Sequence, residues 1–177
     1  MQNMHHLSLS YERKRKVKKT GINFSSPMGL KISFRKGKQE DLDFLFDLKK
    51  ATLQEYVMQT WGWDEEFQRA HHKQNVNPEN FTIIQASGRD IGCLLVEPHP
   101  NSIFLGVIEL LPAFQNQGIG SRIIKDLLKK GEQEAKDVEL QVLKANQRAL
   151  RLYQSLGFII TNETGTHYQL LYSVDKA

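Results

Sequence analysis

The stretch 110–121 constrains the fold most, because there an apolar strand runs into a polar loop with two glycines and then into a helix. The strand is expected to end at Pro112, and the helix is expected to follow Gly118 and to end near Gly131. One face of this helix is apolar and the opposite face is charged, which is typical of a helix that packs on a core. The apolar positions are Ile119, Ile123, Ile124, Leu127 and Leu128.

The loop before this helix is suited to an anion. Gly118 and Gly120 have no Cβ, so a ligand can approach the backbone closely. The first-turn N–H groups of residues 117–121 lack partners within the helix, and together with the helix dipole they favour a pyrophosphate. Two common phosphate motifs are excluded, because the chain has no Gly-Lys-Ser/Thr and because Ile123 stands where a dinucleotide fingerprint needs its third glycine.

The pattern of the chain predicts a single mixed α/β domain, because two helices precede a meander of strands and alternating helices and strands follow. Besides the helix after Gly118, helices are expected over 39–53, 54–72 and 147–156. Strands are expected over 30–35, 81–85, 91–96, 102–111, 138–142, 158–161 and 167–174. The length of 177 residues suits one domain and is short for two.

Composition points to a cytoplasmic protein. No apolar run approaches the roughly 20 residues that cross a bilayer, and residues 1–6 contain no apolar signal region. Cys93 is the only cysteine, so an intrachain disulfide is excluded, which fits a reducing compartment.

Positive charge is concentrated in residues 1–27, which carry six basic residues and one acid, whereas the remainder has a net charge of −1. We expect 1–27 to be a basic, disordered leader and 28–177 to be the single folded domain. A nucleic-acid or membrane-surface arm is the alternative interpretation of the leader.

A second motif lies in residues 146–158. Asn146 is a good N-cap, and Gly157 stands where a glycine ends a helix. Between them, Ala149, Leu152 and Tyr153 recur on one inward face.

The two motifs together resemble the GNAT superfamily of N-acetyltransferases. The first is Gln115-x-x-Gly118-x-Gly120, and the second is Asn146-x-x-Ala149-x-x-Leu152-Tyr153-x-x-x-Gly157-Phe158. The resemblance covers about residues 30–174. It implies a central mixed, mostly antiparallel sheet of six to seven strands with about four flanking helices, and acetyl-CoA as co-substrate.

The resemblance also implies a cofactor site in a split between two strands. Backbone groups of Ile108 and Leu110 are then expected along the pantetheine arm, with the Leu110 amide polarising the thioester carbonyl. Asn146 and Tyr153 are expected near the sulfur. The pyrophosphate is expected on Gln115, Asn116, Gln117, Gly118, Ile119, Gly120 and Ser121.

Acetyl transfer to an amine needs an acid for the leaving thiolate and a base for the attacking ammonium. Tyr153 is the predicted acid, because a phenol stays protonated at about pH 7. Glu109 on the central strand is the predicted base, with Glu163 and His167 as weaker candidates. No metal site is expected, and the adjacent His71 and His72 are interpreted as surface residues.

The acceptor cleft is expected between the first two helices and the last strands. An aromatic wall with several acids there would suit a cationic acceptor. The residues are Tyr56, Trp61, Trp63, Asp64, Glu65 and Glu66.

The predicted function is acetyl transfer to the primary amine of a small molecule or peptide by direct attack in a ternary complex. A non-catalytic acyl-CoA sensor on the same fold is one alternative. An acetyltransferase of a ribosomal or other basic protein is another. We expect no membrane partner and no nucleic-acid partner, and the sequence leaves open whether the protein forms a homodimer.

Overall fold

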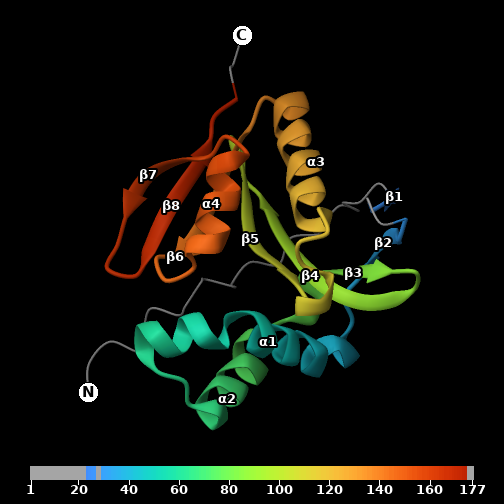
Figure 1. The fold of residues 1–177 in the computed structure, drawn as a ribbon, viewed down its shortest axis with the longest axis vertical. Helices are drawn as coiled ribbons and strands as arrows, with labels where there is room; N and C mark the ends of the chain where they lie inside the picture. Colours follow the sequence, from blue (N-terminus) through green and yellow to red (C-terminus); the bar gives the residue numbers. More distant parts are fainter. Residues whose placement is uncertain (1–22, 27–28, 175–177) are drawn as a thin grey trace.

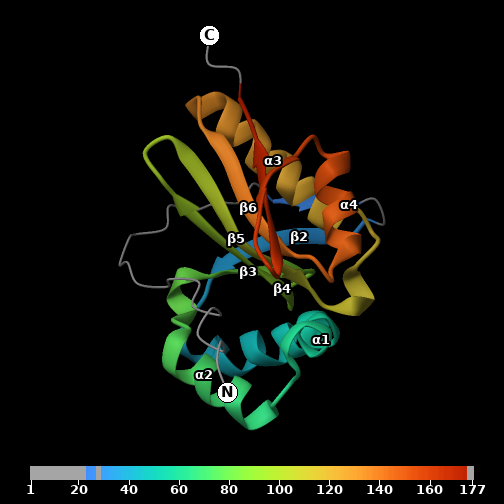
Figure 2. The same ribbon diagram turned by 90° about the vertical axis from the view of Figure 1, so that its left-hand side faces the viewer.

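The computed structural model describes residues 23–26 and 29–174, which form one sheet with helices on both faces (Figure 1, Figure 2). The strands are β1 (Phe24–Ser25), β2 (Lys31–Lys36), β3 (Thr82–Ala86), β4 (Arg89–Pro98), β5 (Ser102–Leu110), β6 (Asp137–Leu143), β7 (Ile159–Glu163) and β8 (His167–Tyr172). The α-helices are α1 (Leu42–Trp61), α2 (Glu65–Asn75), α3 (Ile119–Glu134) and α4 (Gln147–Ser155), and short 3-10 helices cover Gln39–Asp41, Pro78–Asn80 and Pro112–Phe114. Within these described ranges, no helix is both long and apolar enough to cross a membrane.

The strand order is β1-β2-β3-β4-β5-β6-β8-β7, and every neighbouring pair is antiparallel except β5 and β6. This confirms the mixed, mostly antiparallel sheet. The described residues contribute eight strands where six to seven were predicted, because β1 adds a two-residue strand that pairs Phe24 with Ile32. So short a strand has no alternation to reveal it. It lies within the predicted leader 1–27, of which residues 1–22 and 27 fall outside the described ranges.

The sheet has an apolar core on each face, as alternation of side chains along a strand requires. On one face, Ile84 and Leu94 belong to the larger core, which also holds the apolar stripe of α3 and Tyr153 of α4. On the other face, Ile83 and Cys93 pack with the buried leucines of α1. The result is a three-layer molecule in which α3 and α4 cover one face and α1, with α2 beside it, covers the other (Figure 2).

The first two helices divide at a different point from the one predicted. Instead of a boundary between residues 53 and 54, α1 continues to Trp61 and is followed by Gly62, whose φ is 84°. Asp64 then caps α2 by accepting a hydrogen bond from the Phe67 N–H. The turn chemistry of Gly62 and Asp64 therefore sets the boundary, and the sequence near Leu53 has no residue that ends a helix.

The only parallel pair in the described sheet separates after four residues. β5 and β6 are paired from Ser102↔Asp137 to Leu105↔Leu140 and no further. The next residue, Gly106, is the extra residue of a β-bulge, since Leu95 of β4 pairs with Val107 and Val96 pairs with Leu105. A bulge bends its strand and increases its twist, so the bulge at Gly106 directs the rest of β5 away from β6.

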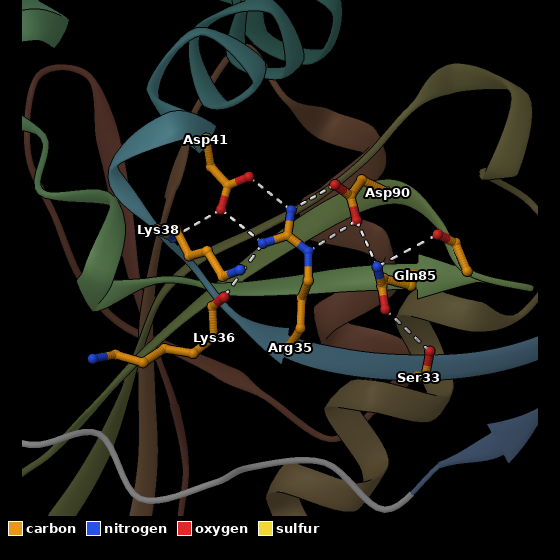
Figure 3. Close-up of polar contacts among 8 residues, drawn as sticks. Ser33, Arg35, Lys36, Lys38, Asp41, Gln85 and Asp90 are labelled. Carbon is orange, nitrogen blue, oxygen red and sulfur yellow. Dashed lines mark hydrogen bonds and ion pairs between the residues drawn. The ribbon is translucent and has the colours of Figure 1, made fainter.

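Arg35 ties the start of α1 to the sheet, as Figure 3 shows. Its guanidinium donates to both oxygens of Asp41 at 2.7 Å and to both oxygens of Asp90 on β4. Asp41 also accepts from the Lys38 N–H at 2.8 Å, and Gln85 donates to Asp90 at 2.9 Å. These contacts join β2, β4 and the entry of α1 in one network of ionised groups.

Hydrogen bonds from Arg35 hold the carboxyl pKa of both Asp41 and Asp90 below the ordinary value. Stabilisation by an acid with a lowered pKa is complete above the unfolded pKa of about 4, and it is lost as the pH falls through the folded-state value. The network therefore contributes stability at neutral pH that acid removes.

We expect Arg35→Met to lower the free energy of unfolding at neutral pH by about 2–3 kcal/mol, because two carboxylates lose their charged donor. Urea denaturation measures this. The difference from wild type should shrink below about pH 4 as the carboxylates become protonated.

Lys36→Met is the matched control. The Lys36 ammonium is exposed and lies 3.7 Å from Glu79, so its removal should change the free energy of unfolding by less than about 1 kcal/mol. Equal losses in the two variants would contradict a structural role specific to Arg35.

Candidate functional site

The site begins at the edge of β5 that the separation from β6 leaves open. The Leu111 N–H donates to Ile91 O on β4 at 2.8 Å. Because backbone groups alternate sides along a strand, those of Leu110 and Ile108 point the other way, into the split. Ile108 and Leu110 thus offer backbone donors and acceptors to the split, and their role along a pantetheine arm stays a prediction.

The loop after β5 brings a helix N-terminus to the same split. Asn116 and Gly118 have φ of 59° and 74°, and these two left-handed residues turn the chain into α3. Gly118 is the N-cap residue, and no side chain caps the helix. The first-turn N–H groups of α3 are therefore available to an anion, and the helix dipole favours one there.

Gly120 lies in the first turn of α3 and lines the split. A Cβ at this position would meet only Leu110 Cδ1, at 3.8 Å, which is ordinary contact. A helix favours alanine over glycine by roughly 1 kcal/mol, so neither packing nor helix propensity explains the glycine. Close approach of a ligand to the backbone does explain it.

Arg148 on α4 is a site residue that the sequence interpretation missed. Its guanidinium donates to Gln115 Oε1 at 2.8 Å and to Asn116 Oδ1 at 2.7 Å. It adds a cation beside the loop, where a phosphate group would lie. No signal in the sequence marks Arg148, since a basic residue in the first turn of an amphipathic helix is normally solvated.

A cavity of about 370 Å³ occupies the split. Its lining includes these predicted residues: Ile108, Glu109, Leu110, Gln115, Asn116, Gly118, Ile119, Gly120, Ser121, Asn146 and Tyr153. Gln117 is absent from the lining, and its side chain turns back to donate to Ala113 O at 2.7 Å. The Asn146 side chain caps α4 through the Ala149 N–H at 3.0 Å.

A second cavity of about 260 Å³ adjoins the first from the side of α1, α2, β6 and β8. The two cavities share Glu109 and Tyr153, among other residues. The site is thus a two-part space, with one carboxylic acid and one phenol at the junction. In the described part of the chain, no three His, Cys, Asp or Glu side chains gather closely enough to hold a metal ion.

Comparison with known proteins identifies the family. The model of the acetyltransferase (GNAT) family matches residues 42–158. The chain belongs to the GNAT acetyltransferase family. The match includes both helices of the second cavity and the whole β5–loop–α3 unit.

Solved structures agree on the GNAT fold. The PaiA N-acetyltransferase from Thermoplasma acidophilum, in complex with coenzyme A, is 18% identical with a TM-score of 0.66, over 80% of this chain and 98% of that one. The ribosomal-protein-S18-alanine N-acetyltransferase from Escherichia coli is 17% identical with a TM-score of 0.59, over 82% of this chain and 96% of that one. At such identities the likeness concerns the fold alone.

Glu109 of this GNAT domain is a carboxylic acid close to its titration point at neutral pH. Burial raises its pKa to about 7, while a hydrogen bond from Thr52 and the charge of Lys49 act in the opposite direction. Both modulating residues come from α1. A base with a pKa near the working pH combines a large ionised fraction with a useful affinity for protons.

Tyr153 is buried on α4, and its ring packs edge-on against Phe158 at 5.8 Å between centroids. Burial, with a smaller effect of the Glu109 charge, raises its pKa to about 12. The phenol is therefore protonated at neutral pH and coupled to the state of Glu109.

The predicted acidic wall does not line either cavity of the GNAT domain. Asp64 caps α2, Glu65 pairs with Lys50 and Arg69, and Glu66 is exposed. Trp63 packs against Phe46 instead. The acids of α2 therefore serve in the helix cap and in surface ion pairs or face solvent, and they do not enter the cavities. Of the predicted wall, only Tyr56 and Trp61 line a cavity.

Three further predictions concern titratable residues near the last strands and α2. His167 lines the second cavity and packs against Trp61 at 5.9 Å between ring centroids. Glu163 lies elsewhere, paired with Lys144 at 3.1 Å. His71 and His72 were predicted to be surface residues, and for His72 the prediction is wrong, since His72 is buried with Nε2 3.0 Å from Leu42 O. His71 is half-buried and lines the second cavity. The position of His72 on α2 turns its side chain toward α1, and the spacing of two adjacent histidines does not reveal this.

Lys49→Met should raise the Glu109 pKa above about 7, because the variant removes a positive charge that favours the carboxylate. Isotope-edited infrared or carbon-detected NMR titration measures the shift. Lys50→Met is the control, since Lys50 pairs with Glu65 on the surface and should leave the Glu109 pKa unchanged. A Glu109 pKa that is the same in Lys49→Met and wild type would contradict the electrostatic coupling.

Proposed function

We propose that the protein is an acetyl-CoA-dependent N-acetyltransferase that acts on the primary amine of a small molecule or peptide. The observation that carries the proposal is the pair of connected cavities with Glu109 and Tyr153 at their junction. The first cavity suits the cofactor and the second suits the amine. Membership of the GNAT family and the coenzyme A in the Thermoplasma acidophilum structure support the choice of cofactor.

The chain offers separate partners for each part of acetyl-CoA. Backbone groups of Ile108 and Leu110 suit the amide-rich pantetheine arm, which would then add to the open edge of β5. The N-terminus of α3 and the nearby Arg148 suit the pyrophosphate. The Leu110 N–H is the proposed donor to the thioester carbonyl, where it would stabilise the oxyanion of the tetrahedral intermediate.

Glu109 is the proposed general base. An alkyl ammonium has a pKa of about 10 and must lose a proton before it attacks. Glu109 takes that proton, the amine nitrogen forms a C–N bond with the thioester carbon, and the C–S bond breaks. The thiolate takes a proton from Tyr153, and the proton that the nitrogen loses as the amide forms restores the phenol.

The coupling between Glu109 and Tyr153 suits this order of events. A phenol with a pKa of about 12 is a weak donor to a thiolate. Part of that raised pKa comes from the negative charge of Glu109, and the charge disappears when Glu109 takes the ammonium proton. Tyr153 therefore becomes a stronger acid at the stage when the thiolate leaves.

Direct attack fits the chain better than an acyl-enzyme route. Cys93 is the only cysteine, and burial raises the pKa of its thiol. A protonated thiol is a poor nucleophile. A purely acyl-CoA-sensing role is the weaker alternative, because sensing gives no function to an acid tuned near neutrality at the cavity junction.

Acetyl-CoA and free CoA should each raise the melting temperature, and NADH should not. A ligand at about 100 times its Kd stabilises a fold by about 2.7 kcal/mol, which corresponds to roughly 5–10 °C for a domain of this size. Gly120→Val should melt within a few degrees of wild type and lose the rise, because a Cβ there meets only Leu110 Cδ1 at 3.8 Å and the added side chain would occupy part of the cavity that Gly120 lines. A full rise in Gly120→Val would show that the cofactor does not approach the N-terminus of α3.

Glu109→Gln should lower kcat by about 100- to 10,000-fold and abolish the increase of kcat/KM with pH that wild type shows through about pH 7. In wild type, kcat/KM rises with pH because only the ionised carboxylate of Glu109 can accept a proton. Tyr153→Phe should lower kcat while the cofactor-induced rise in melting temperature remains. Release of free thiol from acetyl-CoA measures both rates, and an unchanged pH profile in Glu109→Gln would assign the base to another group.

A further inference from the structure

Lys49 lines the second cavity without a direct ion pair to any described carboxylate. Burial lowers its pKa from the ordinary value, and the charge of the nearby Glu109 acts in the opposite direction. Lys49 of α1 is half-buried and lines this cavity but not the first one. In the described part of the chain, no carboxylate oxygen lies within 4.0 Å of its ammonium, and its one side-chain hydrogen bond goes to Gln68 Oε1 at 3.0 Å. Its neighbour on the helix differs, since Lys50 pairs with Glu65.

The remaining titratable groups of the cavity supply little negative charge. His71, His72 and His167 line it, and burial is the main cause that lowers the pKa of each ring, so all three are neutral at about pH 7. The thiol of Cys93 and the phenol of Tyr153 are protonated. Glu109 is the single carboxylate, and the proposed reaction uses it as the base.

This distribution of charge argues against a polycationic acceptor. A diamine or polyamine brings a second ammonium that would need a carboxylate, whereas the cavity offers it the ammonium of Lys49. Like charges in a partly desolvated space repel one another strongly. The charge pattern fits an acceptor that carries its own negative group.

We propose that the acceptor is a small amine that also bears a carboxylate, and that Lys49 binds this carboxylate while Glu109 faces the amine. The proposal rests on the proposed function and names its substrate class. It makes Lys49 a specificity-determining residue, because a carboxylate ligand would supply the direct ion-pair partner that no described carboxylate provides.

The surroundings of Lys49 favour a fixed geometry. Gln68 is 4% exposed, and its amide holds the ammonium from the neighbouring helix α2. The cap that Asp64 provides sets where α2 begins and hence where Gln68 stands. A preorganised cation loses less entropy when it binds an anion, so the lysine would discriminate more sharply than a free surface lysine.

The size and walls of the cavity limit the rest of the acceptor. The volume of about 260 Å³ is slightly below the range of typical drug-sized sites, which favours a small molecule. Val57, Val76 and Phe81 supply apolar lining between the polar ends. An aliphatic or aromatic spacer between the amine and the carboxylate matches this surface.

The test compares three matched acceptor series with acetyl-CoA. The first consists of ω-amino acids from glycine to aminohexanoate, together with leucine. The second replaces each carboxylate by a neutral group, as monoamines and leucinamide. The third consists of diamines of the same chain lengths. We expect at least one carboxylate compound to exceed its neutral and cationic counterparts by roughly 10- to 100-fold in kcat/KM, the size of one charge-assisted hydrogen bond.

Lys49→Met should abolish that preference, and Lys50→Met should preserve it. Methionine has a similar length without the charge, but it leaves the buried Gln68 Oε1 without its donor, so the melting temperature of each variant is measured to show that it is folded at the assay temperature. The ratio between series is the informative quantity, because a change in the Glu109 pKa alters all acceptors alike. A uniform fall across the three series in Lys49→Met means that Lys49 acts only through Glu109, and this overturns the proposal. A preference for diamines also overturns it.

A binding measurement separates failure of this proposal from failure of the proposed function. Melts of the CoA-loaded protein with each compound report acceptor binding without turnover. If no compound is acetylated, acetyl transfer to this class of amine fails as the function, while a melting shift by the carboxylate series that is lost in Lys49→Met still upholds the Lys49 site. No shift with any carboxylate compound, in a protein that CoA does stabilise, overturns the Lys49 site alone.

Discussion

The separation of β5 from β6 at Gly106 is the constraint on which the rest of the site depends. A parallel pair that continued beyond Leu105↔Leu140 would satisfy the backbone of Ile108 and Leu110 with β6 and leave no edge for a ligand. The bulge ends the pairing, bends β5 and sends its last residues toward the N-terminus of α3. One inserted residue thus creates both the open strand edge and the space that the two cavities occupy.

The chemistry of that space comes from the layers on both sides of the sheet. β5 supplies Glu109, α4 supplies Tyr153 from one face, and α1 supplies Lys49 and Thr52 from the other. Burial between these layers raises the pKa of the acid and of the phenol, and the charge of each group alters its neighbours. A rearrangement of α1 would therefore change the acid–base properties of a residue on the central strand. The network of Arg35, Asp41 and Asp90 matters here, because it anchors the start of α1 to β2 and β4.

The two helices beside the second cavity, α1 and α2, place their charged residues in two different environments. Acids of α2 are engaged in a helix cap and in surface ion pairs, whereas Lys49 of α1 turns inward and keeps only an amide partner. This division reverses the charge that composition suggests for the acceptor cleft. Under the proposed function it would link the fold to substrate choice, because the same α2 that carries the acids outward places Gln68 against Lys49.

The sequence alone determined the family, the order of elements and the glycine loop before α3, because Gly118, Gly120 and the apolar stripe of α3 act through local backbone freedom and periodicity. It also predicted Glu109 and Tyr153, since both lie within or beside those motifs. Only the tertiary structure decided the position of Arg148, the burial of His72 and the inward direction of Lys49. Each of these depends on contacts between residues at least 19 positions apart, such as Lys49 with Gln68, His72 with Leu42 and Arg148 with Asn116. Local patterns carry no information about such contacts, because only the packing of one element on another decides whether a charged side chain meets water, a partner or a cavity.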